Sequence, residues 1–294
     1  MTTALAPRTA EISPEERRHH RHRAAHRREK VTQRRVIHSE WIKFWSLRST
    51  PITLISAVVV FVGMGMLASW ISTSADVTQM HAEMSGGQTA FAGISGPAEI
   101  SLAGLDLAQL VIGTLGVLFM AGEYSTGMIR ATLSAVPKRL PVLWGKIAVL
   151  GSVVFVVTLA AAFVAFFAGQ AIIGDVGATL TDPGSLRAIF GAAVYMTGGA
   201  VIGLALGALL RSSPAAIAAL FGIMFLLEGI AMLLLPQAWQ DEVIKFLPSA
   251  AGSAVGAVTP GTFNLDPGPA LAVFAGYLVA FSLAAAWCLR HHDA

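Results

Sequence analysis

The run IAVLGSVVFVVTLAAAFVAFFAGQ, residues 147–170, decides the fold class of this chain. It carries no charged side chain, and it is longer than the about 20 apolar residues that a helix needs to cross roughly 30 Å of hydrocarbon. Similar runs lie on both sides of it. We therefore predict six membrane-spanning helices, at about residues 52–71, 104–121, 147–170, 188–210, 214–235 and 269–289.

The composition agrees with an all-α polytopic membrane protein. Of its 294 residues, 55% are hydrophobic and 13% are charged, whereas soluble domains are about 25% charged. The one cysteine, Cys288, lies in the last apolar run, which excludes an intrachain disulfide and a cysteine-based zinc site. About 50 mostly polar residues precede the first run, unlike the short basic start of a cleavable signal peptide. We expect the first run to be a retained anchor.

Lysine and arginine gather in alternate connections between the predicted spans. The first 50 residues hold 12 of the 20, and residues 122–146 hold four more, whereas residues 72–103 hold none. Cytoplasmic loops of membrane proteins carry the positive excess, so both termini and segment 122–146 are predicted to be cytoplasmic. Because most of this charge belongs to the N-terminal region, the net charge of +3 does not indicate nucleic acid, and we expect no such partner.

Residues 36–50 predict an amphipathic helix in the membrane interface, ahead of the first span. Apolar side chains recur at helical spacing from Ile37 to Trp45, with polar side chains elsewhere on the wheel. Tryptophan favours the headgroup level and basic residues favour an anionic leaflet. A plain soluble helix is the alternative. We expect Thr50–Pro51 to turn the chain into the span, and these residues to contact the bilayer: Trp41, Lys43, Phe44, Trp45 and Arg48.

The preceding residues 1–35 predict a disordered basic cytoplasmic tail near anionic lipid. The stretch EERRHHRHRAAHRREK contains four histidines, which raises the alternative of a metal site. No cysteines or carboxylates stand beside them at the spacing of a metal site. We predict no metal centre.

One acidic residue, Glu228, lies deep within a predicted span, in FLLEGIAML. A carboxylate in the membrane is costly, and by default it is a functional candidate that faces the bundle interior or a water-filled cavity. A structural hydrogen bond to a neighbouring helix is the alternative. We take Glu228 as the first candidate for a translocation path. Weaker candidates are Asp106, Gln109, Gln170 and Tyr195.

Two further patterns concern packing. Small residues are dense in GGAVIGLALGALL, residues 198–210, which favours close approach of helices within one bundle. A dimer-specific role for Gly199, Gly203 and Gly207 is the alternative. Residues 236–263 form a long connection that is too short and interrupted for a span, and we predict an outer-face re-entrant or interfacial helix there.

No enzyme motif is present. The sequence contains no Walker A loop, no H-E-x-x-H, no G-x-S-x-G, and no pair of acidic residues placed for acid–base work within the bilayer. We therefore predict that the chain is not an enzyme and that it binds no cofactor of its own.

Segment 122–146, GEYSTGMIRATLSAVPKRLPVLWGK, supplies the most specific resemblance. Together with the SEWIKFWSLRSTP helix, the six spans and FLPSAAGSAV before the last span, its E-Y-S-T-G-M-I-R-A-T-L-S-A-V-P-K-R stretch resembles the permease subunits of type-2 ATP-binding cassette exporters. These are of the bacterial antibiotic and natural-product export kind. The resemblance covers residues 32–290, although outside the loop any six-span bundle would share the features.

The resemblance implies a type-2 ABC exporter permease fold, a bacterial plasma-membrane location and alternating access. It also implies a second permease copy, most simply a homodimer, and a separate ATPase subunit that binds ATP and magnesium. Segment 122–146 would dock into that subunit as a coupling helix, whereas a purely topology-setting role of its basic residues is the alternative. The contact residues implied are Glu123, Ser125, Arg130, Pro137, Lys138 and Arg139.

Two other functional classes stay open at this point. A six-span membrane enzyme or channel without an ATPase partner would need converging polar groups or a pore-lining ring, and only Glu228 points that way. A membrane-tethered scaffold would depend on residues 1–35. For the exporter we expect a hydrophobic or amphipathic substrate whose identity the sequence does not specify.

Overall fold

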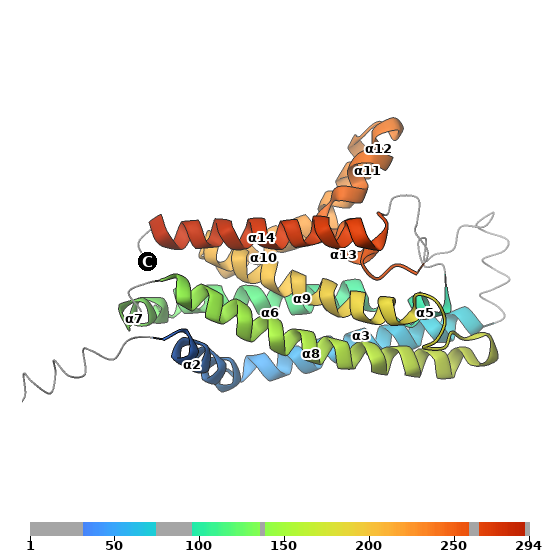
Figure 1. Cartoon of the computed structure of the whole chain (residues 1–294), viewed down its shortest axis with the longest axis horizontal. Coiled ribbons are helices and arrows are strands. Elements are labelled where there is room, and N and C mark those ends of the chain that lie inside the picture. Colours follow the sequence, from blue (N-terminus) through green and yellow to red (C-terminus); the bar gives the residue numbers. More distant parts are fainter. Residues whose placement is uncertain (1–31, 75–95, 136–138, 259–264, 292–294) are drawn as a thin grey trace, which may run out of the picture.

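The structure is a computed structural model that describes residues 32–74, 96–135, 139–258 and 265–291. Within these ranges every regular element is helical and no strand is present. The long helices run side by side as a bundle (Figure 1). Six are long and apolar enough to cross a membrane, so the chain is a multi-pass membrane protein.

The six spans agree with the predicted runs, with ends that differ by a few residues. The largest difference is in the third span, which begins at Leu140 rather than 147 because Pro141 is tolerated in the first helical turn. The elements are α3 (Ser49–Thr73), α6 (Leu105–Ser125), α8 (Leu140–Ile173), α9 (Ser185–Leu210), the composite of α10 (Ser213–Phe221), the π-helix η2 (Gly222–Leu226) and α11 (Leu227–Leu234), and α14 (Pro267–His291).

Short helices occupy both ends of the bundle. At one end, called here the α2 end, lie α2 (Gln33–Ser46), α7 (Met128–Ala135) and the last turn of α14 (Figure 1). At the opposite end, the α5 end, lie α5 (Pro97–Ile100) and the 3₁₀ turn η1 (Gly174–Val176). The first and last described helices therefore meet the same end, as an even number of spans requires.

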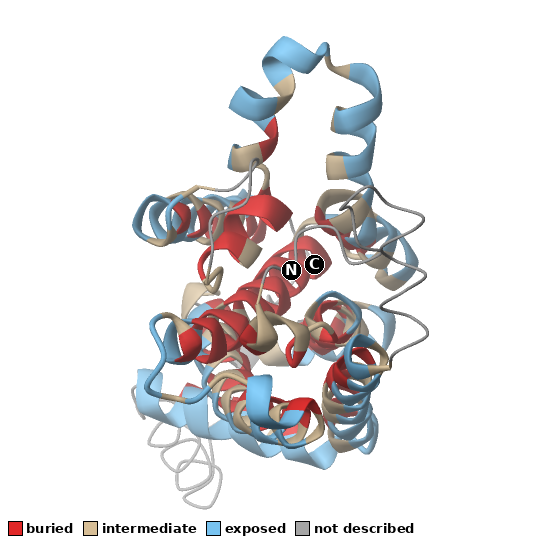
Figure 2. Ribbon diagram, turned by 90° about the vertical axis from the view of Figure 1, so that its right-hand side faces the viewer, coloured by how far each residue is buried: buried red, intermediate tan, exposed pale blue. Residues whose placement is uncertain are grey.

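The α6–α9 pair forms the centre of the bundle, where the buried residues concentrate (Figure 2). The two helices approach closely because glycine faces backbone: Gly116 contacts the carbonyl of Ala200, and Gly203 contacts the carbonyl of Gly113. Gly207 likewise contacts Val117. The glycine row of α9 is thus occupied by α6 of the same chain, which supports ordinary bundle packing over a dimer-specific role.

Two local predictions need correction. The chain turns between α2 and the first span at Leu47, whose backbone is extended, whereas Thr50 and Pro51 lie inside the first turn of α3. Proline fits there because the first turn leaves its N–H groups unpaired in any case. The predicted tail boundary at residue 35 is also late, since α2 already begins at Gln33, and residues 1–31 lie outside the described residues.

The fifth span is bent rather than straight. The π-helix η2 separates α10 from α11, and π-bulges are a known cause of helix bends. Beyond it, α11 and α12 (Gln237–Val243) project from the bundle (Figure 1). The chain then returns through the 3₁₀ turn η3 (Ile244–Phe246) into α13 (Pro248–Ala254), most of whose residues are buried against α14 and α9. Segment 236–263, for which we predicted an outer-face re-entrant or interfacial helix, contains the short helices α12, η3 and α13, and residues 259–264 lie outside the described residues.

Candidate functional site

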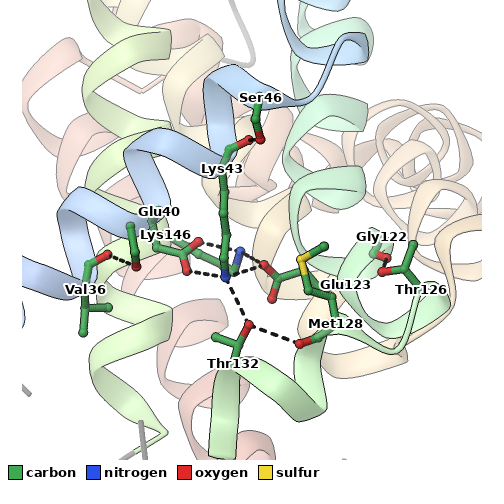
Figure 3. A network of polar contacts seen from close by, with 11 residues as sticks. Val36, Glu40, Lys43, Ser46, Gly122, Glu123, Thr126, Met128, Thr132 and Lys146 are labelled. Atoms are coloured by element: carbon green, nitrogen blue, oxygen red, sulfur yellow. Dashed lines mark hydrogen bonds and ion pairs between the residues drawn. The ribbon is translucent and has the colours of Figure 1, made fainter. Parts of the chain in front are cut away.

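Four helices meet at the α2 end around a group of charged side chains. Glu40 and Lys43 come from α2, Glu123 from the last turn of α6, and Lys146 from the second turn of α8. Figure 3 shows these side chains pointing toward one another, with Thr132 of α7 beside them. We call these five residues the ion network.

The contacts in the ion network are short. The Lys146 Nζ atom donates to Glu40 Oε2 and to Glu123 Oε1, each at 2.7 Å. Lys43 Nζ donates to Glu40 Oε1 at 3.0 Å, to Glu123 Oε1 at 3.1 Å and to the Thr132 hydroxyl at 3.1 Å. Thr132 in turn donates to the carbonyl of Met128 within α7. The network therefore joins all four helices.

Burial makes the ion network energetically important. The side chain of Lys146 is 0% exposed and that of Glu40 is 1% exposed. Two carboxylates and two ammonium groups balance in charge, which is the condition under which buried ions are tolerated. Lys146 Nζ also lies 4.2 Å from the ring centroid of Phe119, a cation–π contact. An isolated charge at this position would be strongly unfavourable.

Lys43 keeps its proton throughout the physiological range. Burial lowers its pKa, but the hydrogen bonds and charges of Glu40 and Glu123 outweigh burial and raise the pKa above the ordinary value of 10.5. The folded state then binds this proton more tightly than the unfolded chain does. The stabilisation is present below the unfolded pKa and is lost as the pH rises through the higher folded pKa.

We expect the loss of the Lys43 proton at alkaline pH to lower the stability of the folded protein. The melting temperature of the detergent-solubilised protein should exceed that of Lys43→Met by a constant amount from about pH 7 to about pH 10, and the difference should shrink above that. Tryptophan fluorescence during heating measures both proteins. Lys245→Met is the matched control, because the ion-pair partner of Lys245 among the described residues is the exposed Glu242. A difference that disappears below pH 9 would contradict the assignment.

The predicted contact residues of segment 122–146 divide between interior and surface. Glu123 is buried in the ion network, and Ser125 is exposed at the end of α6. Arg130 lies in α7. Arg139 donates to the carbonyl of Leu289 at 3.2 Å, which ties the start of α8 to the end of α14. Pro137 and Lys138 lie outside the described residues.

The predicted interfacial residues are likewise split by packing. Phe44 is fully buried, with its ring centroid 5.2 Å from that of Phe119, because this side of α2 lies on α6 and α8 rather than on lipid. Lys43 points into the ion network instead of toward headgroups. Trp41 and Trp45 are 44% and 46% exposed, so they remain available to the bilayer, and Arg48 is exposed between α2 and α3.

Asp106, Gln109, Tyr195 and Glu228, the path candidates, come from α6, α9 and α11 and gather in one region of the bundle. Tyr195 is close enough to both carboxylates for their charges to act on it, and Asp106 and Glu228 also interact electrostatically. Gln170 belongs elsewhere. Its amide nitrogen donates to the carbonyl of Pro97 and to the hydroxyl of Ser101, and its amide oxygen accepts from the N–H of Ala178. These bonds indicate a structural role near α5.

Glu40, Thr132 and Lys146 are the members of the ion network that sequence reasoning missed. Glu40 occupied the polar side of a helix expected to face water, and Lys146 was assigned to the end of a loop. One signal was available: PVLWG precedes Lys146 and IAVL follows it, so a lysine inside a continuous apolar run called for a buried acidic partner.

The ion network connects α7 to α2 and to the two spans α6 and α8. In the part of the chain that the structure describes, no group of three or more histidine, cysteine, aspartate or glutamate side chains is placed to hold a metal ion. The histidines of the tail lie outside that part. No protein-family model matches the chain, and a search of curated proteins gives no match either.

Proposed function

We propose that this protein is the membrane-spanning permease subunit of an ATP-driven ABC transporter, with the type-2 exporter permease fold. Segment 122–146 receives the movement of a separate ATPase subunit, and the spans convert it into export of a hydrophobic or amphipathic compound. ATP and magnesium bind to the partner, and two permease copies form the pathway. The location proposed is the bacterial plasma membrane.

One observation carries this proposal. The helix α7 stands outside the spans, at the end of the bundle where α2 lies, and the ion network joins it to α2, α6 and α8 (Figure 3). A displacement of α7 therefore acts at once on two spans and on the interfacial helix. A helix used only to connect two spans needs no such hydrogen bond to a network of buried charges.

The distribution of charge supports a cytoplasmic position for this end. The described basic residues are concentrated at the α2 end: Arg34, Arg35, Lys43, Arg48, Arg139, Lys146, Arg211 and Arg290. The α5 end carries mainly acidic groups, including Glu99, Asp175 and Asp182, with Arg187 as a basic residue there and Lys245 in the connection between the fifth and sixth spans. The positive-inside tendency then favours cytoplasmic termini.

The direct test is co-purification. Tagged protein extracted gently from its native membrane should recover an ATP-hydrolysing subunit, and Arg130→Ala should weaken that recovery if α7 forms the contact. Recovery of the chain alone under conditions that keep other membrane complexes together would overturn the proposal and favour a six-span membrane enzyme or channel.

Thr132→Val tests the attachment of α7 without removing a charge. The valine keeps the shape but loses the hydroxyl that accepts from Lys43. A hydrogen bond to a charged group contributes about 1.5–3 kcal/mol, so we expect the affinity for the ATPase subunit, or its substrate-stimulated turnover, to fall about tenfold. The melting temperature of the permease itself should also fall, by a few degrees, because the lost hydrogen bond is internal to the chain.

Ser134→Ala is the matched control for this substitution. The Ser134 hydroxyl is exposed and bonds only to the carbonyl of Ala131 within α7. ATPase recovery and turnover should equal those of the wild type. Equal losses in Thr132→Val and Ser134→Ala would show that α7 is merely sensitive to substitution, and would contradict a specific attachment.

A further inference from the structure

A second polar region lies about 25 Å along α6 from the ion network, toward the α5 end, as the 17 residues between Asp106 and Glu123 require. The contacts Gln109–Gly199 and Gly113–Gly203 set the register between the parallel helices α6 and α9. One turn nearer the α5 end, the same register brings Asp106 level with Tyr195. The polar side chains of this region are Asp106, Gln109, Tyr195, Glu228 and Ser249, and we call them the carboxylate cluster.

The helix α13 connects the two sides of the carboxylate cluster. The Ser249 hydroxyl donates to Glu228 Oε2 at 2.9 Å. One turn later on α13, Gly252 packs against the ring of Tyr195, and a side chain there would collide with it. Glu228 is thereby held beside Tyr195, although it comes from the bent outer part of the fifth span.

Gln109 supplies an independent indication that the cluster accommodates a ligand. Its side chain is 1% exposed, and neither its amide nitrogen nor its amide oxygen has a hydrogen-bond partner among the described residues. The amide packs against Gly199, one turn after Tyr195 on α9, and Gln109 itself lies one turn after Asp106 on α6. A buried amide without partners costs about 1–3 kcal/mol, so a group that bonds it would be favoured.

The charge of the cluster indicates which kind of ligand. Within the described residues no lysine, arginine or histidine forms an ion pair with Asp106 or Glu228. Two carboxylates inside membrane spans create a site of negative potential, and such groups usually pair with a cation. Buried apolar and aromatic side chains lie beside the cluster: Phe274 lies 5.8 Å from Tyr195 between ring centroids, and Met224 belongs to the same hydrophobic cluster.

We propose that the carboxylate cluster binds the positively charged group of a lipophilic cation, and that this is the substrate class of the transporter. The identification of this cation as a transport substrate rests on the proposed function. The binding of the cation does not depend on it. Asp106 is exposed and forms the accessible side, and Glu228 is oriented by Ser249. Gln109 supplies a buried amide that has no hydrogen-bond partner among the described residues. The apolar body of the ligand packs on the surrounding spans.

The test is binding of radiolabelled tetraphenylphosphonium to the full chain in nanodiscs of zwitterionic lipid. The variants are Asp106→Asn, Glu228→Gln and the double variant, all of which keep side-chain size. Glu242→Gln is the matched control, because Glu242 is exposed on α12 and pairs with Lys245. Tetraphenylborate, an anion of the same shape, controls for hydrophobic binding.

We expect each single variant to weaken phosphonium binding about tenfold and the double variant about a hundredfold, with Glu242→Gln unchanged. Equal binding by the double variant and the wild type, or equal binding of borate and phosphonium, would overturn the inference. Full displacement of the phosphonium by millimolar Na⁺ or Mg²⁺ would also overturn it, because the site would then belong to an inorganic ion. If the double variant fails to fold, the Asp106→Asn variant decides the question by itself: phosphonium binding equal to that of the wild type would overturn the inference.

This assay separates the two proposals, since it requires no ATPase. Carboxylate-dependent binding without any co-purifying ATPase would leave the cation site standing and remove the transporter assignment. Co-purification of an ATPase together with charge-independent binding would support the transporter assignment and remove the cation site.

Discussion

Replacing Lys146 by methionine is expected to destabilise the protein more than any other single charge removal. The substitution leaves Glu40 and Glu123 buried with one cation, Lys43, between them. Breaking a buried ion pair by removing one partner costs about 3–5 kcal/mol, because the remaining charge stays desolvated. We expect a large fall in the melting temperature and in the yield of monodisperse protein, measured by fluorescence-detected size-exclusion chromatography after heating.

A compensating substitution identifies charge as the cause. In Lys146→Met/Glu40→Gln one positive and one negative charge are removed, and Glu123 with Lys43 remains balanced. The double variant should therefore be more stable than Lys146→Met alone, a strongly non-additive result. Lys245→Met, which breaks an exposed pair on η3, should change stability by less than about 1 kcal/mol. If the double variant is worse than the single one, lost packing rather than charge imbalance explains the effect.

Gly116→Ala is expected to have the second large effect. Gly116 lies where α6 touches the backbone of α9, and a methyl group there would collide with the carbonyl group of Ala200. Backbone cannot move aside as a side chain can, so the two central helices must separate. Overpacking typically costs about 1–3 kcal/mol, and occasionally more. The melting temperature and the recovery of folded protein should both fall.

Gly122→Ala is the control on the same helix. A Cβ atom on Gly122 meets nothing within 4 Å. Alanine has a higher helix propensity than glycine by up to about 1 kcal/mol, so this variant should be as stable as the wild type or more so. Similar losses for both substitutions would show that α6 needs glycine for another reason than its contact with α9.

The two polar regions have complementary properties. The ion network is balanced in charge, and each of its charged side chains forms an ion pair, although Glu123 Oε2 has no hydrogen-bond partner among the described residues. Such a network suits a rigid connection between α7 and the spans. The carboxylate cluster is unbalanced and partly unpaired, which suits a ligand that comes and goes. Coupling between the regions requires two states that differ in contacts at both sites. The α6–α9 pair, which runs from one region to the other, is the element we propose to carry it.

The sequence by itself determined the membrane class, the six spans and the existence of helices at 36–50 and 236–263. These properties depend on local patterns. A run without charges must span or be buried, and an amphipathic period of 3.6 residues must lie between an apolar and a polar environment. The same patterns predict the alternation of charge between the two ends, because each connection can be judged from its own residues.

Only the tertiary structure decided which polar residues meet. Glu40 and Lys146 are separated by 106 positions along the chain, and their pairing depends on how α2 lies across α8. Phe44 and Lys43 looked suited to the bilayer, yet packing of α2 on the bundle turns both inward. Helical periodicity identifies the faces of a helix but not the neighbour that covers each face. Long-range packing therefore made a buried joint from residues whose local pattern indicated water or lipid.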